Sequence, residues 1–385
     1  MSAILDKLLK GQKVEWQLFG EIAKIQRGAS PRPISQFITE DENGIPWIRI
    51  GDTEVDSKYI NSTAQKITQE GGKKSRILKK GDFIMSNSMS YGRPYILAID
   101  GAIHDGWASI TNFTSKLNPD FLYHYLLSEL VQNYWKSKIN SGSVSNLNAD
   151  IIRTLPIPIL PFEVQAEIVR ILDAFTAVTA ELTAELNMRE KQYQYYRDKL
   201  LTFSDNEIIW KSLGEVVKMQ AGKNIKASQI HPSQTDENLY PCFGGNGIRG
   251  YVNNLSHQGE YVIIGRQGAL CGNVQRVKGN FYATEHAVVV TVSDLIDVDW
   301  AYHMLSFMNL NQYASKSAQP GLAVGKLEQL EIPVPSLSEQ KRVAKILDKL
   351  DTITHSITQG LPKEITLRKQ QYEYYREQLI DFPKN

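Results

Sequence analysis

Two long stretches of the chain have the hydrophobic spacing of amphipathic helices. Between residues 162 and 203, apolar side chains recur at intervals of three, four and seven positions, and no proline or glycine interrupts them. At 1.5 Å per residue, this helix would be about 60 Å long. A second run begins with the capping-box pattern Ser336-x-x-Glu339 and meets Gly360-Leu-Pro362, which we expect to break or kink it. Two such helices bury their apolar stripes most easily against each other, although each could instead belong to the core of its own domain.

Short strand-like runs alternate with helix-like runs ahead of each long helix. The strand-like runs are rich in β-branched and aromatic residues and are bounded by Gly, Asp and Asn. This pattern predicts an α/β fold, with two mixed α/β domains separated by two long antiparallel coiled-coil helices. The expected strands lie at 45–50, 82–85, 95–98, 261–264 and 287–291, and the expected shorter helices at 121–139 and 299–313.

The chain repeats its own plan, which makes it a pseudo-two-fold tandem repeat. QAEIVRILD at 165–173 returns as QKRVAKILD at 340–348, and QYQYYRDKLLTF at 192–203 returns as QYEYYREQLIDF at 371–382. Between these matched ends the globular sequences diverge, which suggests one task performed on two different targets. Shorter matches are WQLFGEI at 16–22 with WKSLGEV at 210–216, Gly28 with Gly222, Tyr123-His124 with Tyr302-His303, and the Ile-Pro pairs at 157–158 and 332–333. The expected domains are globular parts at 1–158 and 206–334, and helical segments at 159–205 and 335–385.

Composition and charge restrict the classes of protein to which this chain can belong. Its 385 residues are 42% hydrophobic and 22% charged, as in folded proteins, and the formal net charge is +1. A protein that grips DNA alone is usually basic, so the balance weighs mildly against unaided DNA binding. There is no apolar run long enough to span a membrane and no signal-peptide pattern at the start, which predicts a cytoplasmic location without membrane contact.

The sequence contains no convincing catalytic, cofactor or metal site. Cys242 and Cys271 are the only cysteines, and the seven histidines form no HxH or HxxxH pair. The stretch FGGNG at 243–247 fits the FxGxG pattern of methyltransferases, but the residues after it indicate a turn into another strand, not the helix that the pattern needs. GLAVGK at 321–326 is one residue short of a phosphate-binding loop.

Polar and basic side chains gather on the predicted loops, where they could contact DNA. Arginine, asparagine and glutamine side chains can form two hydrogen bonds at once with the edge of a guanine or adenine base, whereas lysine mostly contacts phosphate and positions the protein on the DNA. The candidate DNA-binding residues are Arg27, Arg32, Lys73, Lys74, Arg76, Asn87, Tyr91 and Arg93 in the first part, and Lys223, Asn224, Asn246, Arg249, Arg266 and Gln267 in the second.

The order of globular part, Ile-Pro strand, ILD helix and QYxYYR ending, repeated once, resembles the DNA specificity subunits of type I restriction–modification systems. The tandem TAEL repeat at 179–186 resembles the repeats that one subgroup of these subunits carries in its central helix. The resemblance implies that each globular part is a target recognition domain reading one half of a bipartite, asymmetric site in double-stranded DNA. It also implies that the helices set the nonspecific spacer and dock two methyltransferase (modification) subunits.

The same resemblance places the chemistry on partner subunits. The modification subunits would bind S-adenosylmethionine, and restriction/translocase subunits would use ATP and Mg, so this chain itself would be non-catalytic and would carry no cofactor. Two alternatives remain from the sequence: a stand-alone sequence-specific DNA-binding regulator, or the recognition subunit of a related non-type-I restriction system. A scaffold that uses only the coiled coil would give the divergent globular parts no role.

Overall fold

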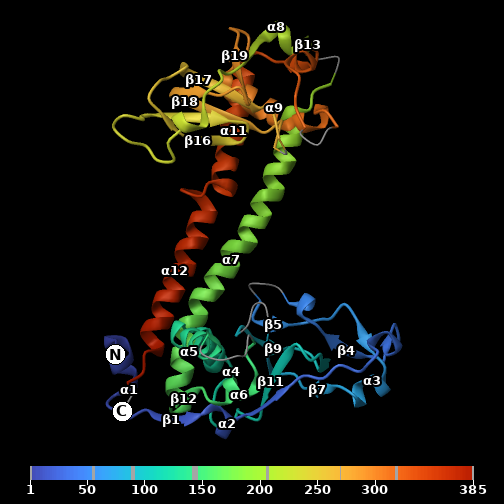
Figure 1. The fold of residues 1–385 in the computed structure, drawn as a ribbon, viewed down its shortest axis with the longest axis vertical. Helices are drawn as coiled ribbons and strands as arrows, with labels where there is room; N and C mark the ends of the chain where they lie inside the picture. Colours follow the sequence, from blue (N-terminus) through green and yellow to red (C-terminus); the bar gives the residue numbers. More distant parts are fainter. Residues whose placement is uncertain are drawn as a thin grey trace. The chain divides into compact units, whose positions relative to one another are not determined.

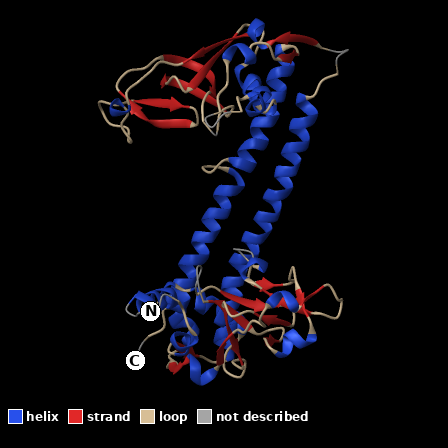
Figure 2. Ribbon diagram, turned by 45° about the vertical axis from the view of Figure 1, so that its right-hand side comes forward, coloured by secondary structure: helices blue, strands red, loops and turns tan. Residues whose placement is uncertain are grey.

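The computed structural model describes residues 2–53, 57–87, 92–140, 146–204, 208–268, 270–316 and 320–383. It divides into two compact units, one of Met1–Glu181 with Ile365–Asn385 and the other of Leu182–Glu364. The division falls inside two helices, α7 (Phe162–Leu201) and α12 (Gly360–Ile380). Each unit contains sheets and helices (Figures 1 and 2), so the predicted mixed α/β class is confirmed.

The first unit contains two five-stranded sheets and a two-stranded ribbon. The sheet that carries most of the candidate site has the order β2 (Lys24–Arg27), β11 (Trp107–Thr111), β8 (Phe83–Ser86), β9 (Pro94–Leu97) and β5 (Tyr59–Ile60). The other has the order β3 (Ile38–Thr39), β6 (Lys66–Ile67), β4 (Ile45–Ile48), β10 (Gly101–Ile103) and β7 (Arg76–Leu78). The ribbon pairs β1 (Glu15–Leu18) with β12 (Pro156–Ile159). The short helices are α1 (Ala3–Leu9), α2 (Phe19–Ile22), α3 (Gln69–Lys73), α4 (Pro119–Leu127), α5 (Glu129–Asn140) and α6 (Ala149–Arg153).

The second unit contains one six-stranded sheet and a matching ribbon. The sheet order is β14 (Val217–Ala221), β19 (Ala287–Val292), β17 (His257–Gly265), β18 (Val274–Ala283), β15 (Tyr240–Gly244) and β16 (Gly247–Val252). The ribbon pairs β13 (Ile209–Ser212) with β20 (Glu331–Val334), and it sets Trp210 opposite Pro333 as the first ribbon sets Trp16 opposite Pro158. The helices are α8 (Leu213–Val216), α9 (Val298–Phe307), α10 (Val324–Leu327) and α11 (Leu337–His355).

Three strands of each sheet have the same order and register, although their sequences differ. In the first unit β11 lies between β2 and β8, and Ser109 faces Gln26 on one side and Ile84 on the other. In the second, β19 lies between β14 and β17, and Val289 faces Gln220 and Ile263. We call these three strands the frame of each unit. The duplication therefore continues inside the globular parts, where the sequences alone indicated divergence.

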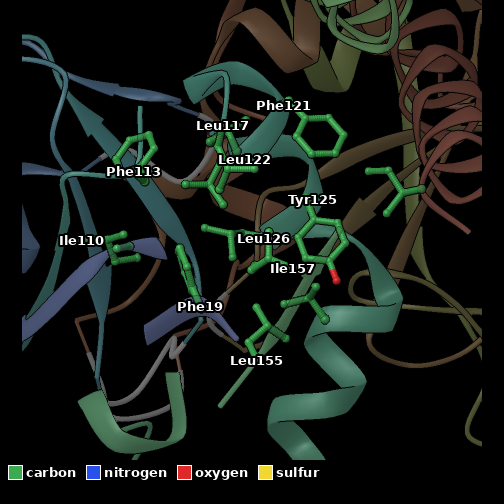
Figure 3. Close-up of a cluster of buried hydrophobic side chains, with 14 of the residues drawn as sticks. Phe19, Ile110, Phe113, Leu117, Phe121, Leu122, Tyr125, Leu126, Leu155 and Ile157 are labelled. Atoms are coloured by element: carbon green, nitrogen blue, oxygen red, sulfur yellow. The ribbon is translucent and has the colours of Figure 1, made fainter. Parts of the chain in front are cut away.

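The long helices contribute to the core of both units. In the first unit, Val164, Ile168 and Leu172 of α7 share a core with Leu379 and Ile380 of α12 and with the side chains of α4 in Figure 3. The two helices run antiparallel there (Figure 1), and the rings of Phe175 and Tyr375 stack 5.0 Å apart. In the second unit, Val343 and Leu347 of α11 share a core with Leu201 of α7. Both sequence interpretations thus hold in part: the helices pair with each other and also belong to the domain cores.

The second long helical segment is divided, as the Gly360-Leu-Pro362 sequence predicts, but the break lies just before that sequence. α11 ends at His355 and α12 begins at Gly360, whose φ is +74°. A side chain at Gly360 would overlap the Thr352 carbonyl oxygen, so this entry into α12 requires glycine. Pro362 then stands in the first turn of α12, where its missing N–H costs no helical hydrogen bond. At the start of α11, Ser336 accepts from Glu339 N as predicted, whereas the Glu339 side chain pairs with Arg342.

The glutamine that opens each ILD motif is a buried anchor. The Gln165 side chain is fully buried, accepts from Asn118 N and donates to the carbonyl oxygens of Lys116 and Leu160. Gln340 is also fully buried and makes the equivalent bonds to Asp297 N and to the carbonyl oxygens of Leu295 and Pro335. Each glutamine therefore ties its long helix to the loop before α4 or α9.

We predict that Gln165→Ala lowers the free energy of unfolding by about 2 kcal/mol or more, because it leaves buried backbone groups unpaired. Urea unfolding measures this, with Glu163→Ala as the control on an exposed position of the same helix turn. The control should change stability by less than about 0.5 kcal/mol. An equal loss in both variants would contradict the anchoring role of Gln165.

Candidate nucleic-acid interface

In the first unit, four predicted residues gather around the turn between β10 and β11. Asp105 lies in this turn and binds two arginines. Arg27 donates from Nε to the Asp105 carbonyl oxygen at 2.9 Å, and Arg32 Nη2 lies 3.1 Å from Asp105 Oδ2. Ser30 donates to the Asp105 carboxylate at 2.7 Å, and this bond, with the two arginines, lowers the pKa of Asp105. Asp105 therefore stays ionised and orients two guanidinium groups whose side chains are 70% and 80% exposed.

Arg76 and Asn87 reach the same turn from other strands. Arg76 donates to the Arg27 carbonyl oxygen and to Gln26 Oε1, each at 2.8 Å, so its guanidinium links β7 to β2. Asn87 follows β8, and its backbone N–H donates to the Gly106 carbonyl oxygen at 3.0 Å. Its side-chain oxygen is buried and has no hydrogen-bond partner among the described residues. This amide oxygen is therefore an acceptor that no donor among the described residues satisfies.

The other predicted residues of the first unit lie apart from this turn or carry internal roles. Lys73 and Lys74 are exposed at the end of α3, where Lys74 pairs with Glu70 and lies 4.6 Å from the Phe37 ring centre. Arg93 packs over the Tyr95 ring, 5.7 Å from its centre. Tyr91 lies outside the described residues.

In the second unit, the predicted residues gather at the turn between β18 and β19. Arg266 follows β17, and its backbone N–H donates to the His286 carbonyl oxygen at 2.8 Å. Gln267 Oε1 accepts from His286 Nδ1 at 2.7 Å. Lys223 follows β14 and forms a parallel bridge with Thr284, while the Asn224 carbonyl oxygen accepts from the Tyr282 hydroxyl at 3.1 Å.

The FGGNG stretch supplies a further part of this second site. It forms the predicted turn into another strand, between β15 and β16. Gly265 packs against Gly245 so closely that a side chain there would overlap the Gly245 carbonyl oxygen. The close approach places Asn246, which accepts from Asn273 Nδ2 at 2.9 Å, beside the end of β17. Arg249 lies across Gly244 and is exposed. The glycines here serve a backbone contact, which explains the methyltransferase-like pattern.

The two turns occupy the same corner of the repeated frame. Gly28 N donates to the Trp107 carbonyl oxygen at 2.7 Å, and Gly222 N donates to that of Ala287 at 2.9 Å. A side chain at either glycine would overlap the backbone of the neighbouring turn, so both positions require glycine. Asn87 and Arg266 also occupy equivalent places, one residue beyond the paired ends of β8 and β17. Asp105, Glu285 and His286 hold these corners and were not predicted from the sequence, although the match of Gly28 with Gly222 pointed to their position.

A second repeated cluster joins a short helix to a long helix in each unit. His124 of α4 is fully buried, with Nε2 2.8 Å from Asp173 Oδ1 and Nδ1 2.8 Å from the Tyr372 hydroxyl. A neutral imidazole can donate from Nε2 to the carboxylate and accept at Nδ1 from the hydroxyl. In the second unit, His303 Nε2 lies 2.8 Å from Asp348 Oδ1. The Tyr-His pairs and the ILD motifs, matched in sequence, thus meet in space.

Burial controls the charge states in these clusters. It lowers the pKa of His124 and of His303, more than the neighbouring aspartates raise it. It also raises the pKa of Tyr372 to about 12. Burial acts to raise the pKa of Asp173 and of Asp348, but hydrogen bonds from the histidines and the charges of nearby cations outweigh it and lower the pKa of both. Each cluster therefore combines a neutral histidine with an ionised aspartate at neutral pH.

In the part of the chain that the structure describes, no group of three or more His, Cys, Asp or Glu side chains has an arrangement that could hold a metal ion. None of its helices is both long enough and apolar enough to cross a membrane.

Comparison with known proteins gives consistent matches over most of the chain. A family model described as the type I restriction modification DNA specificity domain matches residues 13–189 and again residues 207–367. The chain is 43% identical to the type I restriction enzyme EcoprrI specificity subunit of Escherichia coli, with 92% of each chain covered. It is 32% identical to the Escherichia coli EcoR124I/EcoR124II specificity subunit, over 99% of this chain and 97% of that one. The crystal structure of a type I S subunit from M. genitalium has a TM-score of 0.60 at 14% identity, covering 97% of this chain and 98% of that chain, which shows a shared fold.

We predict that stability falls as the pH drops from about 7 to about 5, and that His124→Gln makes the fall less steep. The lowered pKa of His124 means that the unfolded chain takes up a proton near pH 6.5 while the folded chain does not. Burial lowers the pKa of this imidazole, the charge of Lys58 lowers it further, and Asp173 and Asp120 act to raise it, while the Tyr372 hydroxyl faces Nδ1. The slope of unfolding free energy against pH should fall by up to about 1.4 kcal/mol per pH unit. Urea unfolding at several pH values measures it, and identical slopes for the two proteins would contradict the neutral buried state.

Proposed function

This chain belongs to the type I restriction–modification DNA specificity family, and we propose that it reads an asymmetric, bipartite site in double-stranded DNA on behalf of partner enzymes. Each unit reads one half-site through its frame corner, and a stretch of nonspecific sequence separates the halves. The observation that carries the proposal is the pair of equivalent corners with different side chains. One architecture used twice, with unlike donors, fits two unlike targets.

The side chains at the corners have the chemistry for base recognition. Arg27 and Arg32 present exposed guanidinium groups. A guanidinium group can donate hydrogen bonds to O6 and N7 of one guanine at the same time. In the second unit, Gln267 and Asn246 are exposed amides that suit adenine N6 and N7. The exposed lysines Lys73, Lys74 and Lys223 suit phosphate. Arg76, Asn87, Tyr91, Arg93, Asn224, Arg249 and Arg266 complete the proposed interface.

The repeated helix ends provide a surface for two copies of one partner. In the QYxYYR motif, Tyr195 is 59% exposed and Tyr374, at the same position of the second copy, is 61% exposed. Matched aromatic side chains on helices are well suited to pack against partner helices. We assign this surface to two methyltransferase (modification) subunits, which would bring S-adenosylmethionine. Restriction/translocase subunits with ATP and Mg would complete the complex in the cytoplasm.

This division of labour accounts for the near-neutral net charge. Partners that enclose the DNA share the phosphate contacts, so this chain needs no strongly basic surface of its own. We accordingly propose that it is non-catalytic, with target recognition domains at 1–158 and 206–334 and helical segments at 159–205 and 335–385. A solved structure with a TM-score of 0.60 to this chain is described as showing the structural basis of complex assembly and conformational transition of the type I system. This supports a subunit that works within an assembly.

The test is to map adenine methylation in cells that express this chain with its cognate modification subunit, against cells that lack only this chain. We expect a single bipartite, asymmetric motif that depends on this chain, and native mass spectrometry should find about two modification subunits per chain. Tight specific DNA binding by the chain alone would favour a stand-alone regulator. An assembled complex that produces no chain-dependent methylation would overturn the proposal.

A further inference from the structure

In each unit, one cationic side chain contacts the same kinds of residue beside the long helix. In the first unit, Lys58 Nζ is 2.5 Å from Asp120 Oδ1 and 3.6 Å from Asp173 Oδ1. Its ammonium group also lies 5.1 Å from the ring centre of Tyr123. The lysine thus bridges an acid of α4, an acid of α7 and an aromatic face.

Arg276 makes the equivalent contacts in the second unit. Its two terminal nitrogens lie 2.8 Å from Asp299 Oδ1 and 2.6 Å from Asp348 Oδ1. Its guanidinium carbon lies 4.4 Å from the ring centre of Tyr302. The groups that contact the cation belong to the repeated sequence: the tyrosine of the Tyr-His pair, the aspartate of the ILD motif, and an aspartate in the first turn of α4 or α9.

The cations, unlike their acceptors, are not repeated. Arg276 lies on β18 opposite Val262. The corresponding position in the first unit lies opposite Phe83 and is occupied by Ile96 of β9. Lys58 comes instead from the neighbouring chain segment, where its carbonyl oxygen accepts from Ile96 N at 2.9 Å. The two units therefore place a different cation, from a different chain segment, on one duplicated receptor. We call this receptor and its cation the cation joint.

Electrostatics explains why the receptor needs a cation. The two carboxylates of each joint contact one cation beside a buried neutral histidine, so without that cation they would repel each other where solvent reaches them only in part. The Lys58 side chain is 19% exposed and that of Arg276 is 32% exposed. Burial acts to lower the pKa of each, but the paired aspartates outweigh it and raise the pKa of both. The cations are therefore held charged where solvent screens them only in part.

We propose that the cation joint fixes the angle of each recognition sheet on its long helix, and thereby sets how strictly the protein discriminates DNA spacer length. The inference rests on the proposed function. One added base pair moves the second half-site by about 3.4 Å and turns it by about 34°. Discrimination at that scale requires sheets that do not rock on their helices. In each joint the cation lies on the sheet, as Arg276 does, or is hydrogen-bonded to its edge through the backbone, as Lys58 is, and the ILD aspartate belongs to the long helix, so the pair ties the two directly.

Arg276→Met tests this role, because it keeps much of the side-chain volume and removes the charge. The measurement is the ratio of initial methylation rates on two DNAs with identical half-sites, one with the preferred spacer and one with a spacer longer by one base pair. We expect that ratio to fall by about tenfold in Arg276→Met while the half-site sequences stay the same. Arg276→Lys should retain most of the discrimination, since the first joint works with lysine.

Lys278→Met is the matched control. Lys278 lies two residues further along β18, so it projects from the same side of the strand, but its side chain is 83% exposed and pairs only with the exposed Glu260 among the described residues. Its spacer ratio should equal that of the unaltered protein. An Arg276→Met complex that is folded, active and as strict about spacer length as the unaltered protein would overturn the inference.

The outcomes separate this inference from the proposed function. If the unaltered complex gives no bipartite methylation, the proposed function itself fails, whatever the variants do. If Arg276→Met does not fold, Asp348→Asn decides the question, because it removes the charge on the long helix with which Arg276 pairs and keeps an amide oxygen that can still accept from His303. A relaxed spacer ratio in Asp348→Asn would then support the inference, and an unchanged ratio would overturn it.

Discussion

The central strand of each frame, β11 or β19, forms antiparallel ladders along both edges, and these ladders fix where the candidate DNA-contacting side chains lie. A slip of one residue in either ladder would turn every side chain of the strand to the opposite face. Register is therefore strongly specified, and the turns at Asp105 and at Glu285 are held at the same corner of both units. The close approach of Gly28 and Gly222 to these turns completes the corner. Different loops can be carried on this corner because the backbone beneath them is the same.

Each globular part is joined to its long helix by contacts that come from both halves of the repeat. The ILD aspartate of one repeat meets the histidine of its own globular part, while the tyrosine of the other repeat's QYxYYR motif contributes to the same unit. In the first unit this brings Asp173, His124 and Tyr372 together. In the second, Asp348 meets His303, and Tyr193 packs against the hydrophobic core of the unit. The two sequence repeats therefore exchange helix ends, and neither could form a complete unit alone.

The helices and the repeat could be predicted well from the sequence because both follow from local periodicity. The break near Gly360, the Ile-Pro ribbon strands and the turn at 243–247 also rest on local rules for glycine and proline. The frame register could not be predicted because strand pairing depends on residues far apart in sequence, and Trp107-Ala108-Ser109 of β11 differs at every position from Ala287-Val288-Val289 of β19. Acceptors such as Asp105 carry no local signal, because their role is to orient the donors that would face DNA. Sequence alignment could not match Lys58 with Arg276, because Arg276 lies on β18 and Lys58 lies in the segment just before β5.

The central claim is that one corner reads one half-site, and paired alanine substitutions at the two corners test it most directly. The measurement is the methylation motif produced by an Arg27→Ala and Arg32→Ala double variant, compared with that of an Asn246→Ala and Gln267→Ala double variant. The first should relax base preference in one half-site only and the second in the other half-site only, by about 1–3 kcal/mol for each bidentate hydrogen-bonded pair that the substitution removes. Relaxation of both half-sites by either variant, or an unchanged motif in both, would contradict the account.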